Sequence, residues 1–271
     1  KGVQGARSGS GVPWAQLGVL GLGVGAVAAA DVWPRPLPAI GLVAAGFAVL
    51  ALVMASDARA KIRLMPHRAH DLTTVAGSGY ALLFAMSSAS MGFTVFMPAL
   101  LQRLHGLSPL WAGYVVGAQA LAWTVCAVSV SGAPPGRERL LIRTGCSLIV
   151  AGVAALAVLT RTGPLALIVL ASIVLGSGFG LSTSFISRRI LGVLSEEDRA
   201  IGSSALISVR QTGGAAGAAI SGAVANLCGF SAGFTVASAE ASAVWIFVAT
   251  LPLALVGLMA AVRFTGSATP A

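Results

Sequence analysis

The residues of this sequence that could bind a small ligand are polar or aromatic side chains inside long apolar runs. Gln119 and Trp123 lie one helical turn apart and share a helix face, where an amide could hydrogen-bond to a ligand and an indole could stack on it. Arg210 and Gln211 lie inside an apolar segment, where a charge must reach the membrane surface or meet a partner. Simpler interpretations remain open: a glutamine that joins two helices, a tryptophan that packs, and an arginine that reaches the lipid headgroups.

A wider set of candidate ligand-binding residues shares the same setting. Met86, with Met91, Phe93 and Met97, would give a soft apolar wall suited to varied hydrophobic ligands, although such side chains in membrane helices more often only pack. The residues that we predict to line a cavity are Met86, Ser90, Thr94, Gln119, Trp123, Ser177 and Gln211.

Charged residues gather at the ends of the apolar runs. Arginines there could pair with acids or helix C-termini of a neighbouring helix in one conformation and release them in another. The alternative is a solvated loop that only sets orientation in the membrane. The candidates for such a gate are Arg137, Arg139, Arg188, Arg189, Arg199 and Arg210, next to Glu196, Glu197 and Asp198. The acidic cluster is expected to lie in a polar loop that precedes a helix rich in small residues.

Composition indicates a membrane protein whose first partner is the lipid bilayer. Of 271 residues 56% are hydrophobic and 9% are charged, and the mean hydropathy is +0.90. A soluble domain carries about 25% charged residues. The net charge of +9 does not favour nucleic acid, because the basic residues are scattered between apolar runs. The cysteines have no metal-type spacing, and we predict no metal and no cofactor.

The apolar runs divide the chain into eight expected spans, because a helix needs roughly 20 apolar residues to cross a bilayer. The predicted spans are residues 13–30, 37–55, 73–101, 109–131, 140–159, 164–187, 203–227 and 241–262. The first run also resembles a secretory signal with a small-residue cleavage site, and this alternative stays open. Every Lys and Arg except Arg35, Arg103 and Arg161 falls on one side of these spans, which predicts cytoplasmic termini.

Polar residues are unevenly distributed among the spans. The third, fourth, sixth and seventh carry many Ser, Thr and Gln residues, whereas the fifth and eighth carry few. Polar groups in lipid must face protein or water. We therefore expect the order inner, inner, outer, repeated once, as a three-plus-three inverted repeat. The predicted domains are two linker-type helices (1–56), a basic cytoplasmic loop (57–72), a six-helix unit (73–263) and a short cytoplasmic tail (264–271).

Glycine pairs spaced four residues apart are typical of helices that approach each other closely in membranes. The pairs that we predict to serve helix packing are Gly113 with Gly117, Gly176 with Gly180, and Gly213 with Gly217.

Several segments resemble one family. They are GFTVFMPALLQRLHGLSPLWAG at 92–113, GAPPGRERLLIRTG at 132–145, and EEDRAIGSSALISVRQTGGAAGAAISG at 196–222. Their order and spacing resemble the C-terminal half of the major facilitator superfamily, preceded by the two extra helices of its fourteen-span drug:proton antiporter branch. The resemblance implies an integral protein of the cell membrane that exports drugs or other small hydrophobic molecules by alternating access. It also implies proton coupling through acids of an N-terminal half that this chain lacks.

Two other functions belong to different classes. A non-transporting membrane scaffold, or a degenerate remnant of a transporter, would have the same composition. An intramembrane enzyme would need clustered His, Asp or Glu at membrane depth, and the sequence places its acids in loops or near span ends. We therefore predict that the chain is not an enzyme.

Overall fold

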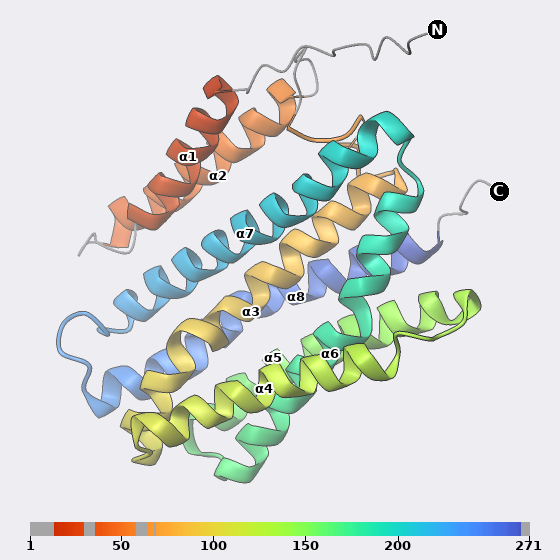
Figure 1. Ribbon diagram of the computed structural model, residues 1–271. Helices are drawn as coiled ribbons and strands as arrows, with labels where there is room; N and C mark the ends of the chain where they lie inside the picture. Colours follow the sequence, from red (N-terminus) through yellow and green to blue (C-terminus); the bar gives the residue numbers. More distant parts are fainter. Residues whose placement is uncertain (1–13, 30–35, 58–63, 68, 267–271) are drawn as a thin grey trace, which may run out of the picture.

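The computed structural model describes residues 14–29, 36–57, 64–67 and 69–266, which fold into helices without any strand in these ranges. The α-helices are α1 (Trp14–Ala29), α2 (Pro36–Asp57), α3 (Val75–His105), α4 (Pro109–Ser129), α5 (Glu138–Thr162), α6 (Leu165–Gly192), α7 (Glu196–Leu227) and α8 (Val236–Gly266) (Figure 1). A short 3-10 turn, η2 (Pro135–Arg137), precedes α5. The predicted all-helical fold is confirmed.

Five of the described helices are long and apolar enough to cross a membrane: α3, α4, α5, α6 and α8. Helix α7 is 32 residues long but carries acids, arginines and many Gly, Ala and Ser residues, and it is not among the five. The chain is therefore an all-helical protein with several membrane-spanning helices. The count of eight spans stays a prediction.

The polar loop expected before the seventh span is mostly helical. Helix α6 runs to Gly192 and α7 begins at Glu196, so the connection is only residues 193–195. The Ser195 hydroxyl caps α7 by accepting a hydrogen bond from the Asp198 backbone N–H, and the acidic first turn suits the positive end of the helix dipole. This earlier start places Arg210 near the middle of α7, rather than about two turns from its beginning.

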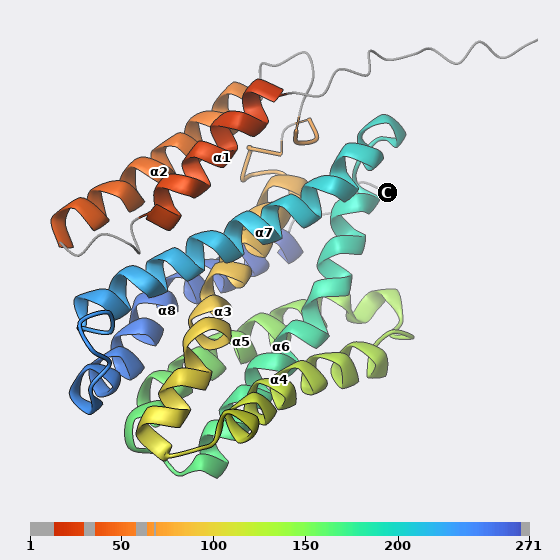
Figure 2. The ribbon, with the colours of Figure 1, turned by 60° about the vertical axis from the view of Figure 1, so that its left-hand side comes forward.

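Helices α3 and α6 make the main contacts of the bundle. Helix α3 packs against α7 and α8, α6 packs against α4 and α5, and α5 packs against α8. In Figure 1, α7, α3, α6 and α4 lie in front of α8 and α5, and Figure 2 shows the same bundle from the side. The main apolar core lies between these helices and includes Leu82, Ile142, Leu175 and Phe247.

Helices α1 and α2 form a hairpin beside the bundle. They pack against each other and against α7 (Figures 1 and 2). The rings of Phe47 in α2 and Phe84 in α3 also meet edge to face, with their centroids 6.5 Å apart. The hairpin therefore covers part of α7, the least apolar of the long helices. That the hairpin is a separate linker domain stays a prediction.

Candidate functional site

A cation from α7 and two aromatic rings, one from α4 and one from α6, lie close together in the bundle. The Arg210 guanidinium carbon lies 5.8 Å from the centroid of the Trp123 ring. The Trp123 ring in turn lies 5.2 Å from the ring of Phe179, at an interplanar angle of 35°. A cation over an indole ring is attracted by about 0.5–1 kcal/mol at exposed sites and by about 2 kcal/mol when desolvated. We call these three residues the Arg210 cluster.

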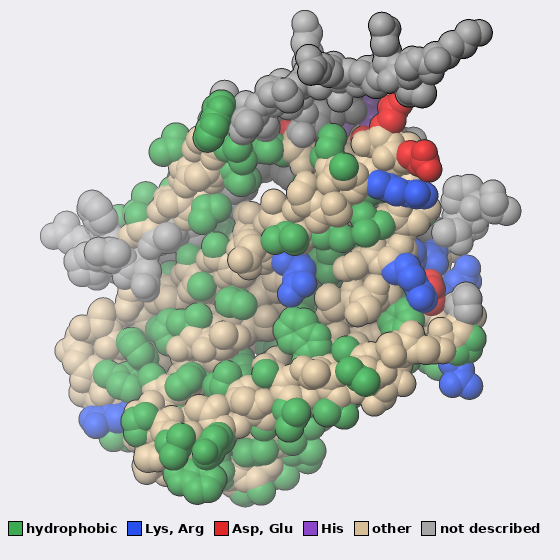
Figure 3. Space-filling model, in the orientation of Figure 1, with side chains coloured by type: hydrophobic (Ala, Val, Ile, Leu, Met, Phe, Trp, Pro, Cys, Tyr) green, Lys and Arg blue, Asp and Glu red, His purple; other side chains and the backbone are tan. Residues whose placement is uncertain are grey.

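The Arg210 cluster lies on the side of the bundle formed by α3, α4, α6 and α7, which we call the open face. Arg210 is exposed and Trp123 is half-buried, whereas Phe179 is buried. Helices α4 and α7 do not pack against each other in the described chain, so the Arg210 side chain crosses the space between them. Figure 3 views this side and shows basic side chains in its middle as well as at its right-hand end.

Glycines on α6 bring the backbone of α4 close enough to position Trp123. A Cβ at Gly176 would collide with the backbone oxygen of Gln119, and a Cβ at Gly180 would collide with that of Trp123. Gly178 serves the other side of α6, where a Cβ would lie 2.6 Å from the backbone oxygen of Gly145 in α5. Helix α6 is thus held tightly between α4 and α5.

Glycines on α7 fix the helix that carries Arg210. A Cβ at Gly213 would lie 2.6 Å from the backbone oxygen of Phe84, and one at Gly217 would collide with the backbone oxygen of Ser88. The Ser88 hydroxyl donates a hydrogen bond of 2.7 Å to the Gly213 carbonyl, which joins α3 to α7. Arg210 lies one turn before Gly213, so this contact sets where its side chain starts.

The structure separates the predicted cavity residues into two groups. Met86 is buried and its Sδ lies 3.9 Å from the Cys146 Sγ of α5, while the buried Ser90 hydroxyl donates to the Ser87 carbonyl of its own helix. These two residues belong to the packed interior rather than to the open face. Thr94 and Gln211 are exposed, and Gln119, Trp123 and Ser177 are half-buried. Trp123 is the predicted cavity residue that meets Arg210.

Gly113 and Gly117 differ from the other glycine pairs. Both are exposed, and a Cβ at either position would meet nothing within 4 Å. The helix contact that we expected at these two residues is not made within the described part of the chain, because they lie on a side of α4 that no other described helix covers.

Arginines join three helices at one end of the bundle, which we call the basic end. Arg188 in α6 forms an ion pair with Glu138 in α5. Arg189, also in α6, is buried with its guanidinium carbon 5.4 Å from the ring centroid of Phe264 in α8. All these residues lie in the helix ends, where the sequence suggested loops.

A further arginine of the basic end connects α5 to α8. The Arg143 Nε donates a hydrogen bond of 2.7 Å to the Thr265 hydroxyl. Other predicted gate residues at this end are exposed, namely Arg137, Arg139 and Arg199. Arg210 lies apart from them, in the Arg210 cluster.

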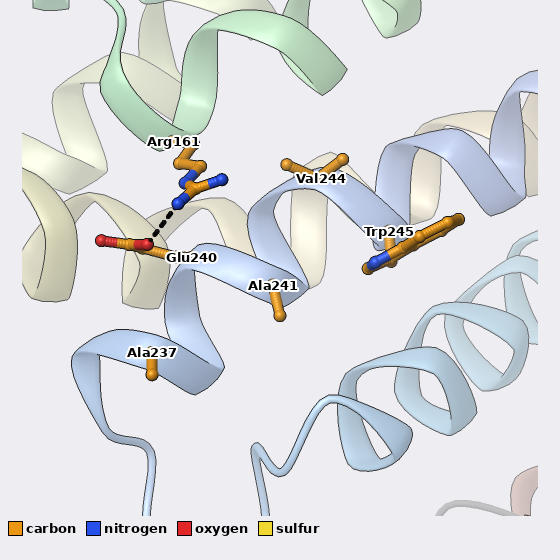
Figure 4. A pocket seen from close by; sticks show the side chains of 6 residues that line it. All are labelled: Arg161, Ala237, Glu240, Ala241, Val244 and Trp245. Carbon is orange, nitrogen blue, oxygen red and sulfur yellow. Dashed lines mark hydrogen bonds and ion pairs between the residues drawn. The ribbon is translucent and has the colours of Figure 1, made fainter.

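At the opposite end, a shallow cavity of about 320 Å³ lies between the end of α5 and the start of α8. Figure 4 shows its lining residues and the ion pair between Arg161 and Glu240, whose nitrogen and oxygen are 2.8 Å apart. Their side chains are 52% and 37% exposed, and an exposed pair of this kind contributes little stability. None of the residues that line this cavity belongs to the Arg210 cluster.

Sequence reasoning missed some partners in these sites. Phe179 lies between two glycines in GSGFG, and this setting of a large ring among small residues was an available signal. Glu138 and Thr265 gave no such signal, because their partners Arg188 and Arg143 are 50 and 122 residues away in the chain.

The fold and the site together define a class: a multi-pass, all-helical membrane protein with a charged and aromatic cluster on one open side of its bundle. No family model matches the chain. Proteins from two strains of Mycobacterium tuberculosis, each described as a probable multidrug-efflux transporter, are similar to it, with 28% identity over 236 residues. The match covers 83% of this chain and 47% of each relative, so the chain spans about half the length of these relatives.

Proposed function

We propose that this chain forms one half of a secondary transporter that exports drugs or other small, mostly hydrophobic molecules by alternating access. The observation that carries the proposal is the Arg210 cluster near the middle of long helices, on a side of the bundle that no described helix covers. Secondary transporters bind their substrates near the bilayer midplane, between two structural repeats or halves. Ionisable residues within the membrane mark such pathways.

The most extensive helix contacts, though not the smaller α7–α8 contact, follow the pattern of a three-plus-three repeat within this half. Helix α3 contacts α7 and α8, and α6 contacts α4 and α5. In such a repeat α3 corresponds to α6, α4 to α7 and α5 to α8. The α3–α7 contact then corresponds to the α6–α4 contact, and the α3–α8 contact to the α6–α5 contact. The α5–α8 contact corresponds to itself. Inverted repeats are a common construction in secondary transporters. In this proposal α5 and α8 face lipid, and the other four helices face the transport path.

The second half, in this proposal, supplies the opposite wall of the path and the acids for proton coupling. The similar transporters are about twice as long as the match. The carboxylates of the described helices lie within about the first or last two turns, at Asp57, Glu138, Glu196, Glu197, Asp198 and Glu240. Proton carriers in membranes are normally acids at greater depth. We place the protein in the cell membrane, in the fourteen-span antiporter branch, with the basic end in the cytoplasm.

Reading the DNA upstream of the Lys1 codon tests this proposal first. We expect an in-frame coding region for a further set of membrane spans. We then expect the extended protein, but not this chain alone, to lower the accumulation of fluorescent hydrophobic dyes in cells, and a protonophore to abolish that effect. An extended protein that is inserted in the membrane but transports none of a panel of cationic, neutral and anionic dyes would instead indicate a non-transporting scaffold or remnant.

A further inference from the structure

We propose that Arg210 and Trp123 bind aromatic anions, with Arg210 holding a carboxylate and Trp123 stacking on the ring. This inference rests on the proposed function and names the substrate class for the path along the open face. The two residues come from helices that do not pack together and meet only through their side chains, so a ligand would take the place of this side-chain contact.

The first step of the argument is charge. Arg210 lies near the middle of α7, where a guanidinium at membrane depth faces a water-filled space or pairs with an opposite charge. On the described parts of α3, α4, α6 and α7, the acids are Glu196, Glu197 and Asp198, all in the first turn of α7. Arg210 instead lies over the face of Trp123, which attracts a cation but does not neutralise it. An anion from outside this chain would supply the missing charge.

The second step is geometry. A guanidinium is planar and presents parallel N–H donors that match the two oxygens of a carboxylate. Trp123 is half-buried, and Phe179 supports its ring from α6 at 5.2 Å. A flat ring attached to the carboxylate would meet the indole while the carboxylate meets Arg210. Hydrogen bonds to charged groups are stronger than an exposed cation–π contact, so the ligand can displace the contact between Arg210 and Trp123.

The third step concerns rigidity. Gly176 and Gly180 hold the backbone of α4 against α6, and Gly213 and Gly217 hold α7 against α3. The two binding side chains thus stand on helices whose positions are fixed from behind, while their side chains face the space between α4 and α7. A site of this kind needs little rearrangement of the backbone when a ligand binds.

Binding to the full chain in lipid nanodiscs tests the inference. Equilibrium dialysis would compare 1-naphthoate with 1-naphthylmethylammonium, which has the same ring system and the opposite charge, against empty nanodiscs. We expect saturable binding of 1-naphthoate and weaker binding of the cation. Replacing Arg210→Gln should weaken 1-naphthoate binding about tenfold or more, because a charged hydrogen-bond partner is lost. Arg210→Lys should fall between, and Trp123→Leu should weaken binding more than Trp123→Phe.

The matched control is Arg161→Gln, which removes the same charge at the opposite end of the bundle. We expect it to change 1-naphthoate binding less than twofold. Circular dichroism and size-exclusion profiles would show that each variant is folded. Equal binding of the two probes, no saturable binding of 1-naphthoate, or an equal loss in Arg161→Gln would overturn the inference. Dye transport by the extended protein would leave the proposed function standing in that event, whereas a lack of all transport would end the proposed function whatever the chain binds.

Discussion

The Ser88 hydroxyl joins α3 to α7 at the base of the open face. It donates to the Phe84 carbonyl of its own helix at 2.9 Å and to the Gly213 carbonyl of α7 at 2.7 Å. The Ser172 hydroxyl, by contrast, bonds only to the carbonyl one turn earlier in its own helix. Interhelical hydrogen bonds in membrane proteins contribute about 0.6 kcal/mol on average.

Replacing Ser88→Ala should therefore lower the free energy of unfolding by about 0.6 kcal/mol. Unfolding in mixed micelles with increasing denaturing detergent measures this difference. Ser172→Ala is the matched control, since Ser172 is equally buried but makes only the bond within its helix. We expect the control to change stability less than Ser88→Ala. An equal loss in both variants would show that the contact with Gly213 adds nothing.

Residue types alone were enough to predict Trp123 and Arg210 as candidate site residues, because a charge or an indole N–H inside an apolar run needs a polar partner or water. They were not enough to assign Met86, whose side chain is buried against α5. A membrane helix is apolar on every side, so its sequence has no clear period to show which residues face a neighbour. Only the packed structure therefore shows which residues of α3 lie on the open face.

Close packing by glycine decides how the helices of the open face are arranged. Gly180 lies against the α4 backbone at Trp123, whereas Gly117 has open space around it. The two residues have the same spacing to a second glycine in the sequence, so sequence alone could not distinguish them. The predictions for the end of α6 and the start of α7 are also wrong. Ser195 and the acids after it were interpreted as a loop, but Ser195 caps α7 and the acids form its first turn.

Replacing Gly180→Ala should push α4 away from α6, because the new Cβ collides with the Trp123 backbone oxygen. We expect a loss of about 1–3 kcal/mol in the free energy of unfolding, as for other overpacked sites. Gly117→Ala should be neutral or stabilising by up to about 1 kcal/mol, because alanine favours helix and the space is open. Denaturation in mixed micelles compares the two variants, and a larger loss for Gly117→Ala would contradict this assignment of the packing.

At the scale of the whole molecule, the sequence was a better guide to where the helices are than to which helices pack against each other. All eight predicted runs that fall in the described residues are helical, since long apolar runs leave few alternatives. Helix α7 departs from the simple rule: it is too polar to span lipid by its own hydropathy, and it packs against α3, α8 and the α1–α2 hairpin. A helix that packs against protein on several sides needs fewer apolar side chains, so low hydropathy alone does not exclude α7 as a span.

The central claim is that the open face, formed by α3, α4, α6 and α7, borders a water-filled path, while the outer side of α8 meets lipid. Single cysteines test it directly in the protein extended with its second half, after Cys126, Cys146 and Cys228 are replaced by alanine. A Gln119→Cys variant reports on the open side next to Trp123, and a Val256→Cys variant reports on the exposed side of α8. We expect a charged, membrane-impermeant thiol reagent to modify the first and not the second. Modification of Val256→Cys but not of Gln119→Cys would contradict the account.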